Sequence, residues 1–410
     1  MIQKAFRQYI SNFQGFSREI WILTLVTFIN RAGTMVLPFL SKYLNEDLHF
    51  PLSQVGTIMV FFGCGSMLGS WLGGKLSDTI GFYKIMIFSL LVSGLMFFGL
   101  QFITSFYGLC IGVFLIMTVS DMFRPAMFVS LGAYAKPENR TRALTLVRLA
   151  INLGFAAGPA LGGLIIMGIG YKGLFWVDGL TCIIAILIFW VKVKEKKKST
   201  YLDKNQPGDV LVQSVFKDKI YWLFLATSLI VGIMFFQLFT TIPLYHSKQF
   251  GLSEFQTGLL LTLNGVLVFF LEMPIVNYIE KNKKDKLKVV ITGTLLMAIS
   301  LLLMLVNTWA GILIIMMFFM SFAEMFNFPF SNAFAMSRAP KHQQGRYMAI
   351  FTMSYSLAHI LSAKIGMTIV EAYGYQANWL FMGLLGITAT FIGFYVLKLV
   401  AKEKLNVKNS

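Results

Sequence analysis

The sequence predicts an all-α membrane protein whose twelve transmembrane helices form two six-helix bundles. The chain is strongly apolar, with 57% hydrophobic and 13% charged residues in 410. Its apolar runs reach about 20 residues, the length at which a helix crosses the hydrocarbon core of a bilayer. Matching polar residues also recur at a nearly constant spacing in the two halves of the chain. Together these features exclude a soluble globular protein of this size.

Twelve apolar runs are long enough to span a bilayer. They cover residues 20–43, 55–76, 85–104, 107–134, 144–168, 174–193, 220–245, 256–279, 289–307, 310–337, 347–372 and 376–400. We expect an N-terminal bundle over residues 20–193 and a C-terminal bundle over residues 220–400, joined by a cytoplasmic linker at 194–219. Residues 1–19 are expected to form an amphipathic segment on the inner membrane surface, and residues 401–410 a cytoplasmic tail.

The basic residues orient these helices, because short cytoplasmic loops retain Lys and Arg. Most of the 35 basic residues lie in the two tails and in the loops after even-numbered helices. Both termini are therefore expected in the cytoplasm, with the chain in a bacterial inner (plasma) membrane. The net charge of +17 is then an orientation signal. Its dispersal over separate loops argues against nucleic-acid binding.

Matching residues in the two halves indicate an internal duplication. Pro38 matches Pro243, and Asp121 in Asp-Met-Phe matches Glu324 in Glu-Met-Phe, at offsets between 200 and 205. A near-constant offset indicates a parallel repeat of one six-helix unit, and two such units usually face each other across a central cavity. This is the plan of a transporter.

Acidic residues inside the apolar runs are the expected proton-coupling sites, because an acid in hydrocarbon costs about 3 kcal/mol and is kept for a reason. Asp121 has Arg124 one helical turn away, so the pair either neutralises itself or takes part in a proton cycle. Glu324 has no basic neighbour within a turn and is the main expected protonation site. Glu272 is a third candidate, with a structural hydrogen bond as its alternative.

The basic residues in the apolar runs are expected to pair with these acids or to bind an anionic part of a substrate. Structural pairing or packing is the alternative for each, and snorkelling to the membrane surface is a further one for Lys364. These residues are Arg31, Arg124, Arg148, His359 and Lys364. Three residues from mixtures of aromatic and polar side chains, Phe236, Gln237 and Asn327, are expected to line the cavity and to suit amphipathic molecules. Generic packing is the alternative for these three as well.

The segment between the second and third apolar runs resembles a loop signature of the major facilitator superfamily, G-x-L-A-D-R-x-G-R-R-K. Five signature positions match here, at Gly74, Leu76, Asp78, Gly81 and Lys84. Thr79, Phe82 and Tyr83 stand where the family has basic residues. The resemblance implies the major facilitator fold with alternating access, and it implies a cytoplasmic gating role for Asp78. A simple capped turn is the alternative.

The fifth apolar run is similar to the G-x-x-x-G-P-x-x-G-G motif of proton-coupled antiporters in that superfamily. The matching residues are Gly154, Gly158, Pro159, Gly162 and Gly163, while Thr145 stands in place of the upstream glycine. The resemblance implies export of small amphipathic compounds, drugs or metabolites, in exchange for protons. Close helix packing alone is the alternative.

A fainter resemblance to proton-dependent oligopeptide transporters rests on Arg124-Pro125 and on Ile151 to Gly154. It implies the alternative function, proton-coupled uptake of peptides or another polar nutrient.

Signatures of enzymes and of metal sites are missing from the sequence. It contains no G-x-x-x-x-G-K-[ST] nucleotide loop, so ATP hydrolysis is not the expected energy source. Four dispersed histidines and three unpaired cysteines give no metal-ligand spacing. We therefore expect a protein that is not an enzyme, has no cofactor and draws energy from a proton gradient. Its expected partners are a small-molecule substrate, protons and membrane lipids, and it is expected to act as a monomer.

Overall fold

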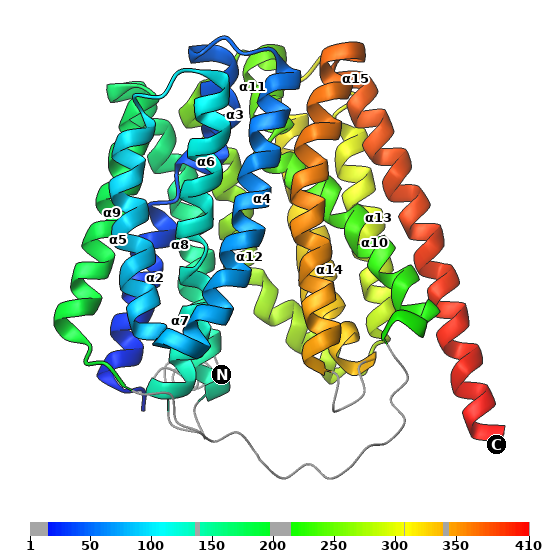
Figure 1. The fold of residues 1–410 in the computed structure, drawn as a ribbon. Coiled ribbons are helices and arrows are strands. Elements are labelled where there is room, and N and C mark those ends of the chain that lie inside the picture. The colour runs from blue at the N-terminus through cyan, green and yellow to red at the C-terminus, as the bar shows by residue number, and fades with distance from the viewer. Residues whose placement is uncertain (1–14, 136–139, 197–214, 307, 339–343, 410) are drawn as a thin grey trace, which may run out of the picture. The chain divides into compact units, whose positions relative to one another are not determined.

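The computed structural model describes residues 15–135, 140–196, 215–306, 308–338 and 344–409, and these contain helices but no strand (Figure 1). Eleven of the helices described are long and apolar enough to cross a membrane. The last one, Ile350–Glu403, has 54 residues, which is enough for two crossings. It is interrupted at Gly374, whose φ of 83° lies in the left-handed region. The predicted all-helical fold class is confirmed.

The chain divides into two compact units that we describe separately. Unit 1 comprises Met1–Val36 and Cys64–Lys204. Its helices are α2 (Arg18–Ala32), the part of α4 (Leu52–Leu76) from Cys64 onward, a π-helical turn at Ser77–Gly81, α5 (Phe82–Leu100), α6 (Phe106–Ser120), α7 (Phe123–Tyr134), α8 (Arg140–Ile169) and α9 (Lys172–Lys192). Helix α2 packs on α8 and α9, and α5 packs on α6, α7 and α9.

Small residues hold the helices of unit 1 close together. Gly65, Gly69 and Gly73 form a stripe along α4, and a Cβ at each would lie 2.3 to 2.5 Å from a backbone carbonyl oxygen of the segment 114–122. Gly94 of α5 and Gly179 of α9 meet in the same way. Small residues are the usual means of bringing helix backbones together in a membrane, where lipid tails are as apolar as leucine.

Unit 2 comprises Leu37–Gly63 and Asn205–Ser410. Its helices are α3 (Val36–Lys42), a π-helical turn at Tyr43–Asp47, the first part of α4, 3-10 turns at Val215–Lys217 and Gln237–Phe239, α10 (Lys219–Phe236), α11 (Thr241–Phe250), α12 (Glu254–Lys281), α13 (Lys286–Leu303), α14 (Ile312–Arg338) and α15 (Gln344–Asn409). Helices α10, α13, α14 and α15 lie side by side (Figure 1).

Polar side chains fix where several helices of unit 2 begin. Ser253 accepts a hydrogen bond from the backbone N–H of Gln256, and the Gln256 side chain accepts one from the N–H of Ser253. This capping box satisfies two donors that α12 would otherwise leave unpaired. Asp218 and Asp285 cap α10 and α13 with their carboxylates. Each cap adds about 1 kcal/mol to helix stability.

The first apolar run of each half contains a break that the expected continuous spans do not show. In unit 1 the chain leaves helical hydrogen bonding after α2 and starts α3 at Val36. In unit 2 the 3-10 turn at Gln237–Phe239 separates α10 from α11.

The two units differ from the expected bundles at residues 37–63, which belong to unit 2. The division into bundles at 20–193 and 220–400 stays a prediction. Residues 1–14 of the expected surface segment and 197–214 of the expected linker lie outside the described residues.

Candidate functional site

Asp121 lies at the turn between α6 and α7 in unit 1. It is the C-terminal cap of α6, and its side chain is half-buried. The Ser66 hydroxyl of α4 donates a hydrogen bond to Asp121 Oδ2. The Arg31 guanidinium is within electrostatic range of Asp121 and of Arg124. Arg124 itself is exposed, and the described residues contain no Asp121–Arg124 ion pair within 4.0 Å. The hydrogen-bond partner of Asp121 is instead Ser66, which the sequence did not indicate.

The antiporter-like motif on α8 packs against the end of α2. A Cβ at Gly154 would lie 2.6 Å from Arg31 Cβ, and one at Gly158 would lie 3.2 Å from the Ala32 carbonyl oxygen. The Arg31 guanidinium also lies over the Phe155 ring, 5.7 Å from its centroid. These glycines therefore set the position of Arg31 relative to α8.

Three other motif residues, Pro159, Gly162 and Gly163, are buried in α8. Pro159 has no N–H to donate within the helix, which permits bending at this point. Arg148, one turn and a half before Gly154 on α8, is exposed.

A Gly154→Ala substitution is expected to lower the free energy of unfolding by about 1–3 kcal/mol, because the new methyl group overlaps Arg31. Gly168→Ala is the matched control, since Gly168 lies in the same helix and a methyl group there would meet no atom within 4 Å. The control should keep or slightly raise the melting temperature of the purified protein. Equal melting temperatures for both variants would contradict the close packing of α2 and α8.

Glu324 lies near the middle of α14 in unit 2 and is half-buried. The Asn264 amide of α12 donates a hydrogen bond of 3.2 Å to Glu324 Oε2 and one of 3.0 Å to Ser321 Oγ. The described residues include no basic side chain paired with Glu324 within 4.0 Å. Glu272, half-buried on α12, is the second acid that interacts with Glu324 electrostatically. The sequence identified both acids but not Asn264, whose type and position carried no signal.

An aromatic cluster of unit 2 includes Phe328, and Phe235 joins its ring pairs at 5.5 Å from Phe236 and 4.8 Å from Phe328. The His359 ring stacks on Phe236 at 4.4 Å between centroids and meets Phe62 edge-on at 5.2 Å. Phe328, one turn after Glu324 on α14, meets Tyr355 at 5.6 Å. His359 Nε2 and the Tyr355 hydroxyl are buried without a hydrogen-bond partner among the described residues. Buried polar groups are normally bonded, so these two atoms are open to a ligand or to water.

Gln237 and Asn327 are fully buried in hydrogen-bond networks. Gln237 donates to Ser362 at 2.9 Å and accepts from Asn378 at 3.2 Å. Asn327 of α14 donates to Thr294 Oγ1 of α13 at 3.1 Å. Both side chains join helices of unit 2 in this structure, and their expected role in lining a cavity stays a prediction.

The remaining expected residues are Lys364 and those of the loop motif. Lys364 is exposed on α15 and donates to Thr57 Oγ1 of α4 at 2.9 Å. In the loop motif, Gly81 has a φ of 105°, which only glycine adopts readily. A methyl group at Gly74 would meet no atom within 4 Å, and Lys84 is exposed. The Asp78 side chain lies outside the described residues, so its expected gating role stays a prediction.

Asp178 is a buried acid that the sequence reasoning missed. It lies in α9 of unit 1 with 3% of its surface exposed. Its Oδ1 accepts a hydrogen bond of 2.9 Å from the Met35 N–H, and its Oδ2 one of 3.1 Å from the Val36 N–H. These donors belong to the break before α3, so Asp178 anchors it. A lone acid in an apolar run was the same signal that identified Asp121.

Asn378 lies 200 residues after Asp178, in the last of the expected apolar runs. Asn378 is fully buried and donates to Gln237 Oε1, at the break between α10 and α11. The breaks after α2 and after α10 are thus each contacted by one buried polar residue from a later helix.

An ion cluster in unit 2 joins α3 and the turn that follows it to the start of α12. Lys42 is fully buried, and its Nζ lies 2.9 Å from Glu254 Oε1 and 3.7 Å from Glu46 Oε2. Ser247 Oγ donates to Glu46 at 2.5 Å. The sequence analysis did not identify Lys42 as part of an ion cluster, because pairing between residues far apart in the chain leaves no local pattern.

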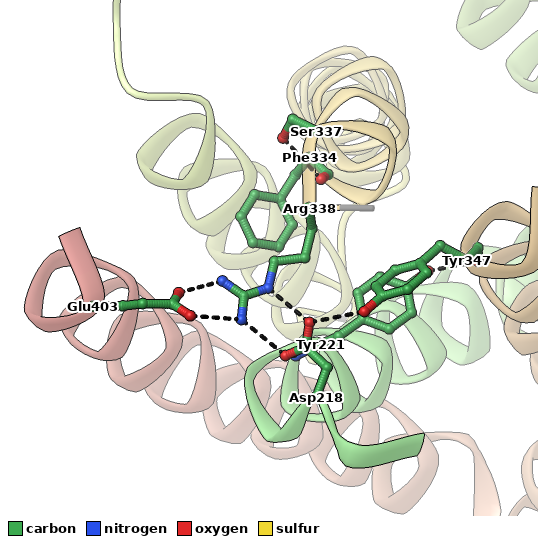
Figure 2. Close-up of polar contacts among 7 residues, drawn as sticks. All are labelled: Asp218, Tyr221, Phe334, Ser337, Arg338, Tyr347 and Glu403. Atoms are coloured by element: carbon green, nitrogen blue, oxygen red, sulfur yellow. Dashed lines mark hydrogen bonds and ion pairs between the residues drawn. The ribbon is translucent and has the colours of Figure 1, made fainter. Parts of the chain in front are cut away.

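A second ion cluster joins the ends of three helices of unit 2 (Figure 2). The Arg338 guanidinium at the end of α14 contacts Asp218 at 2.8 and 2.9 Å and also pairs with Glu403 of α15. The Tyr347 hydroxyl donates to Asp218 at 3.2 Å. Burial alone would raise the pKa of the Asp218 carboxyl, but these hydrogen bonds outweigh it and hold its pKa below the ordinary value. Asp218 therefore remains charged at neutral pH.

The helices and the acids inside them define a class of protein, the polytopic membrane transporters. A sequence profile of the Major Facilitator Superfamily matches residues 21–363 and 282–410. The chain belongs to this superfamily. It is thus a multi-pass transporter of small molecules, and the expectation that it is not an enzyme is confirmed.

Relatives of known sequence cover most of the chain. The uncharacterized MFS-type transporter YttB of Bacillus subtilis is 23% identical over 88% of this chain and 90% of its own length. A Na(+), Li(+), K(+)/H(+) antiporter of Planococcus maritimus is 20% identical over 92% of this chain and 95% of its own length. The class H tetracycline resistance protein of Pasteurella multocida is 23% identical over 72% of this chain and 74% of its own length.

Solved structures share the fold. A POT family transporter crystallised with a thioalcohol-conjugated peptide superposes with a TM-score of 0.77 at 16% identity, covering 95% of this chain and 97% of its own. The nucleoside transporter NupG superposes with a TM-score of 0.75 at 14% identity, covering 93% and 100%. These similarities confirm the predicted major facilitator fold.

Proposed function

We propose that this chain is a proton-coupled antiporter that exports small amphipathic compounds, drugs or metabolites, by alternating access. The observation that carries the proposal is the setting of Glu324, an acid inside a membrane helix whose hydrogen-bond partner is the neutral amide of Asn264. A carboxyl group bonded to an amide keeps its partner in both protonation states, whereas one in an ion pair loses a charge interaction on protonation. Glu324 is therefore the main protonation site.

The aromatic cluster that includes Phe328 is the proposed binding surface for the apolar part of a substrate. Phe236, Phe328 and Tyr355 supply flat apolar faces, and His359 supplies a polar atom without a partner among the described residues. Ligand sites of this kind combine many apolar contacts with a few placed polar groups. Because Phe328 follows Glu324 by one turn, substrate and proton would act on the same segment of α14.

Asp121 is the proposed coupled site in unit 1, with Arg31 and Arg124 as charges within range. The Ser66 hydroxyl can donate to the Asp121 carboxylate and accept from the protonated acid, so the contact survives a change of protonation state. Glu272 is a third proposed proton group because it interacts with Glu324.

The names of two relatives support exchange against protons, because one is a cation/proton antiporter and one is a tetracycline resistance protein. A proton gradient as the energy source, with no cofactor, is part of the proposal. So are a monomeric state, a bacterial inner membrane and cytoplasmic termini, the last supported by the distribution of basic residues.

Proteoliposomes with an acidic lumen test the direction of coupling. With tetracycline or ethidium added outside, we expect accumulation in the lumen as protons leave, measured with a pH-sensitive dye. The added compound should dissipate the pH gradient only in liposomes that contain the protein. Accumulation of the compound should stop when an ionophore removes the gradient first. Release of a preloaded dipeptide such as dialanine together with protons would instead establish the alternative, peptide symport.

A further inference from the structure

A groove opens between α12 and α13 at their joined ends in unit 2. It has a volume of about 610 Å³. Its walls are apolar side chains of three helices, among them Ile275 of α12, Val289 of α13 and Phe326 of α14. The groove is independent of the Glu324 site, because none of its lining residues is a proposed proton or substrate group.

The local sequence explains why the groove is open. Pro274 lies inside α12 and lines the groove, and it cannot donate a hydrogen bond to the Phe270 carbonyl, which weakens the helix there. Lys283, with a φ of 50°, reverses the chain in the short turn between the helices. Both α12 and α13 pack on α14, which forms the floor with Phe326. Helix α14 thus fixes the positions of α12 and α13 on the two sides of the groove.

The mouth of the groove is basic. Lys284 and Lys288 are exposed and line it. The Lys284 ammonium is held over the Tyr278 ring, 4.9 Å from its centroid, which directs it to the α12 side of the mouth. Asp285 is the acid at the mouth, and its Oδ1 accepts from the N–H groups of Leu287 at 2.9 Å and Lys288 at 3.4 Å. The carboxylate is therefore directed to the helix start.

We propose that this groove binds one anionic phospholipid of the cytoplasmic leaflet. Its phosphate would lie between Lys284 and Lys288, and an acyl chain would follow Ile275, Val289 and Phe326. Three observations together favour a lipid over a soluble anion. The groove lies at the ends of two helices that are long and apolar enough to cross a membrane, its walls are apolar, and its charges gather at the mouth. Basic residues next to a membrane helix attract anionic headgroups.

Lipid-dependent stability of the purified full-length protein tests the proposal. In neutral detergent, phosphatidylglycerol is expected to raise the melting temperature more than phosphatidylcholine of the same acyl chains, and inorganic phosphate is expected to have no effect. Native mass spectrometry should show one retained phosphatidylglycerol. In Lys284→Gln/Lys288→Gln the apparent affinity for phosphatidylglycerol should fall about tenfold or more, since each lysine near an anionic surface contributes a few-fold.

Two further variants separate this groove from general charge attraction. Lys192→Gln/Lys194→Gln removes the same charge from exposed lysines outside the groove and should leave the lipid effect unchanged. Thr292→Trp fills the groove from its exposed α13 wall while keeping both lysines, and it should abolish retention of the lipid. An equal effect of the two lysine pairs, an unchanged lipid effect in Thr292→Trp, or equal stabilisation by phosphatidylcholine would overturn the proposal.

Discussion

Replacing Glu324 by glutamine is expected to abolish proton-coupled exchange and to leave the protein folded. Glutamine keeps the size of the side chain and an oxygen that can accept the hydrogen bond from Asn264. It cannot gain or lose a proton, so substrate flux should no longer respond to the pH gradient. In proteoliposomes with an acidic lumen, accumulation of the tested compound should fall to the level of liposomes without protein.

The matched control is Glu195→Gln, which neutralises an exposed acid outside the membrane helices and should transport normally. Exchange of compound between the two sides without a gradient should persist in Glu324→Gln, because the binding surface is intact. Full proton-driven accumulation by this variant would remove Glu324 from the mechanism and leave Asp121 or Glu272 as the coupling group.

Replacing Asp178 by alanine is expected to produce the largest loss of stability, about 2–5 kcal/mol. The substitution removes two hydrogen bonds to a carboxylate, each worth about 1.5–3 kcal/mol. It leaves the Val36 N–H without an acceptor and the Met35 N–H with only the Gly33 carbonyl oxygen, 2.8 Å away. The break between α2 and α3 then loses its anchor on α9. The melting temperature of the purified protein, followed by intrinsic tryptophan fluorescence, should drop clearly below that of the unmodified chain.

Two comparisons give this result its meaning. Asp178→Asn keeps one oxygen acceptor and should fall between the alanine variant and the unmodified chain. Asp47→Ala removes an exposed carboxylate at the end of the Tyr43–Asp47 turn and should change stability by less than about 0.5 kcal/mol. An unchanged melting temperature in Asp178→Ala would mean that the N–H groups of the break find water or another acceptor.

The helical fold could be predicted from the sequence because hydrophobic length is a local property. The breaks in the first helices could not be predicted. Gly33, Thr34 and Met35 are compatible with a continuous helix, and the break there is fixed by hydrogen bonds to Asp178, far along the chain. Asp178 stands in an apolar run as Asp121 does, and treating every lone acid alike would have found it. Its role as an acceptor for backbone donors still depended on tertiary structure.

The candidate site was predictable in its acids and not in their partners. Glu324 stands out because a carboxyl group in an apolar run is rare. Asn264 and Ser66 do not stand out, because small polar residues are common in membrane helices and bond equally well to their own backbone. The exposure of Arg124 in this structure shows that sequence spacing alone does not predict an ion pair. A separation of three residues places two side chains on one face but does not bring their charges into contact.

The anchors at Asp178 and Asn378 hold their breaks through different bonds. The Asp178 carboxylate accepts from two backbone N–H groups, so its contact depends on the path of the main chain and not on which side chains Met35 and Val36 carry. Asn378 donates to the side chain of Gln237, so its contact requires that residue. Substitutions at the first break can therefore leave its anchor intact, whereas a substitution of Gln237 removes the anchor of the second.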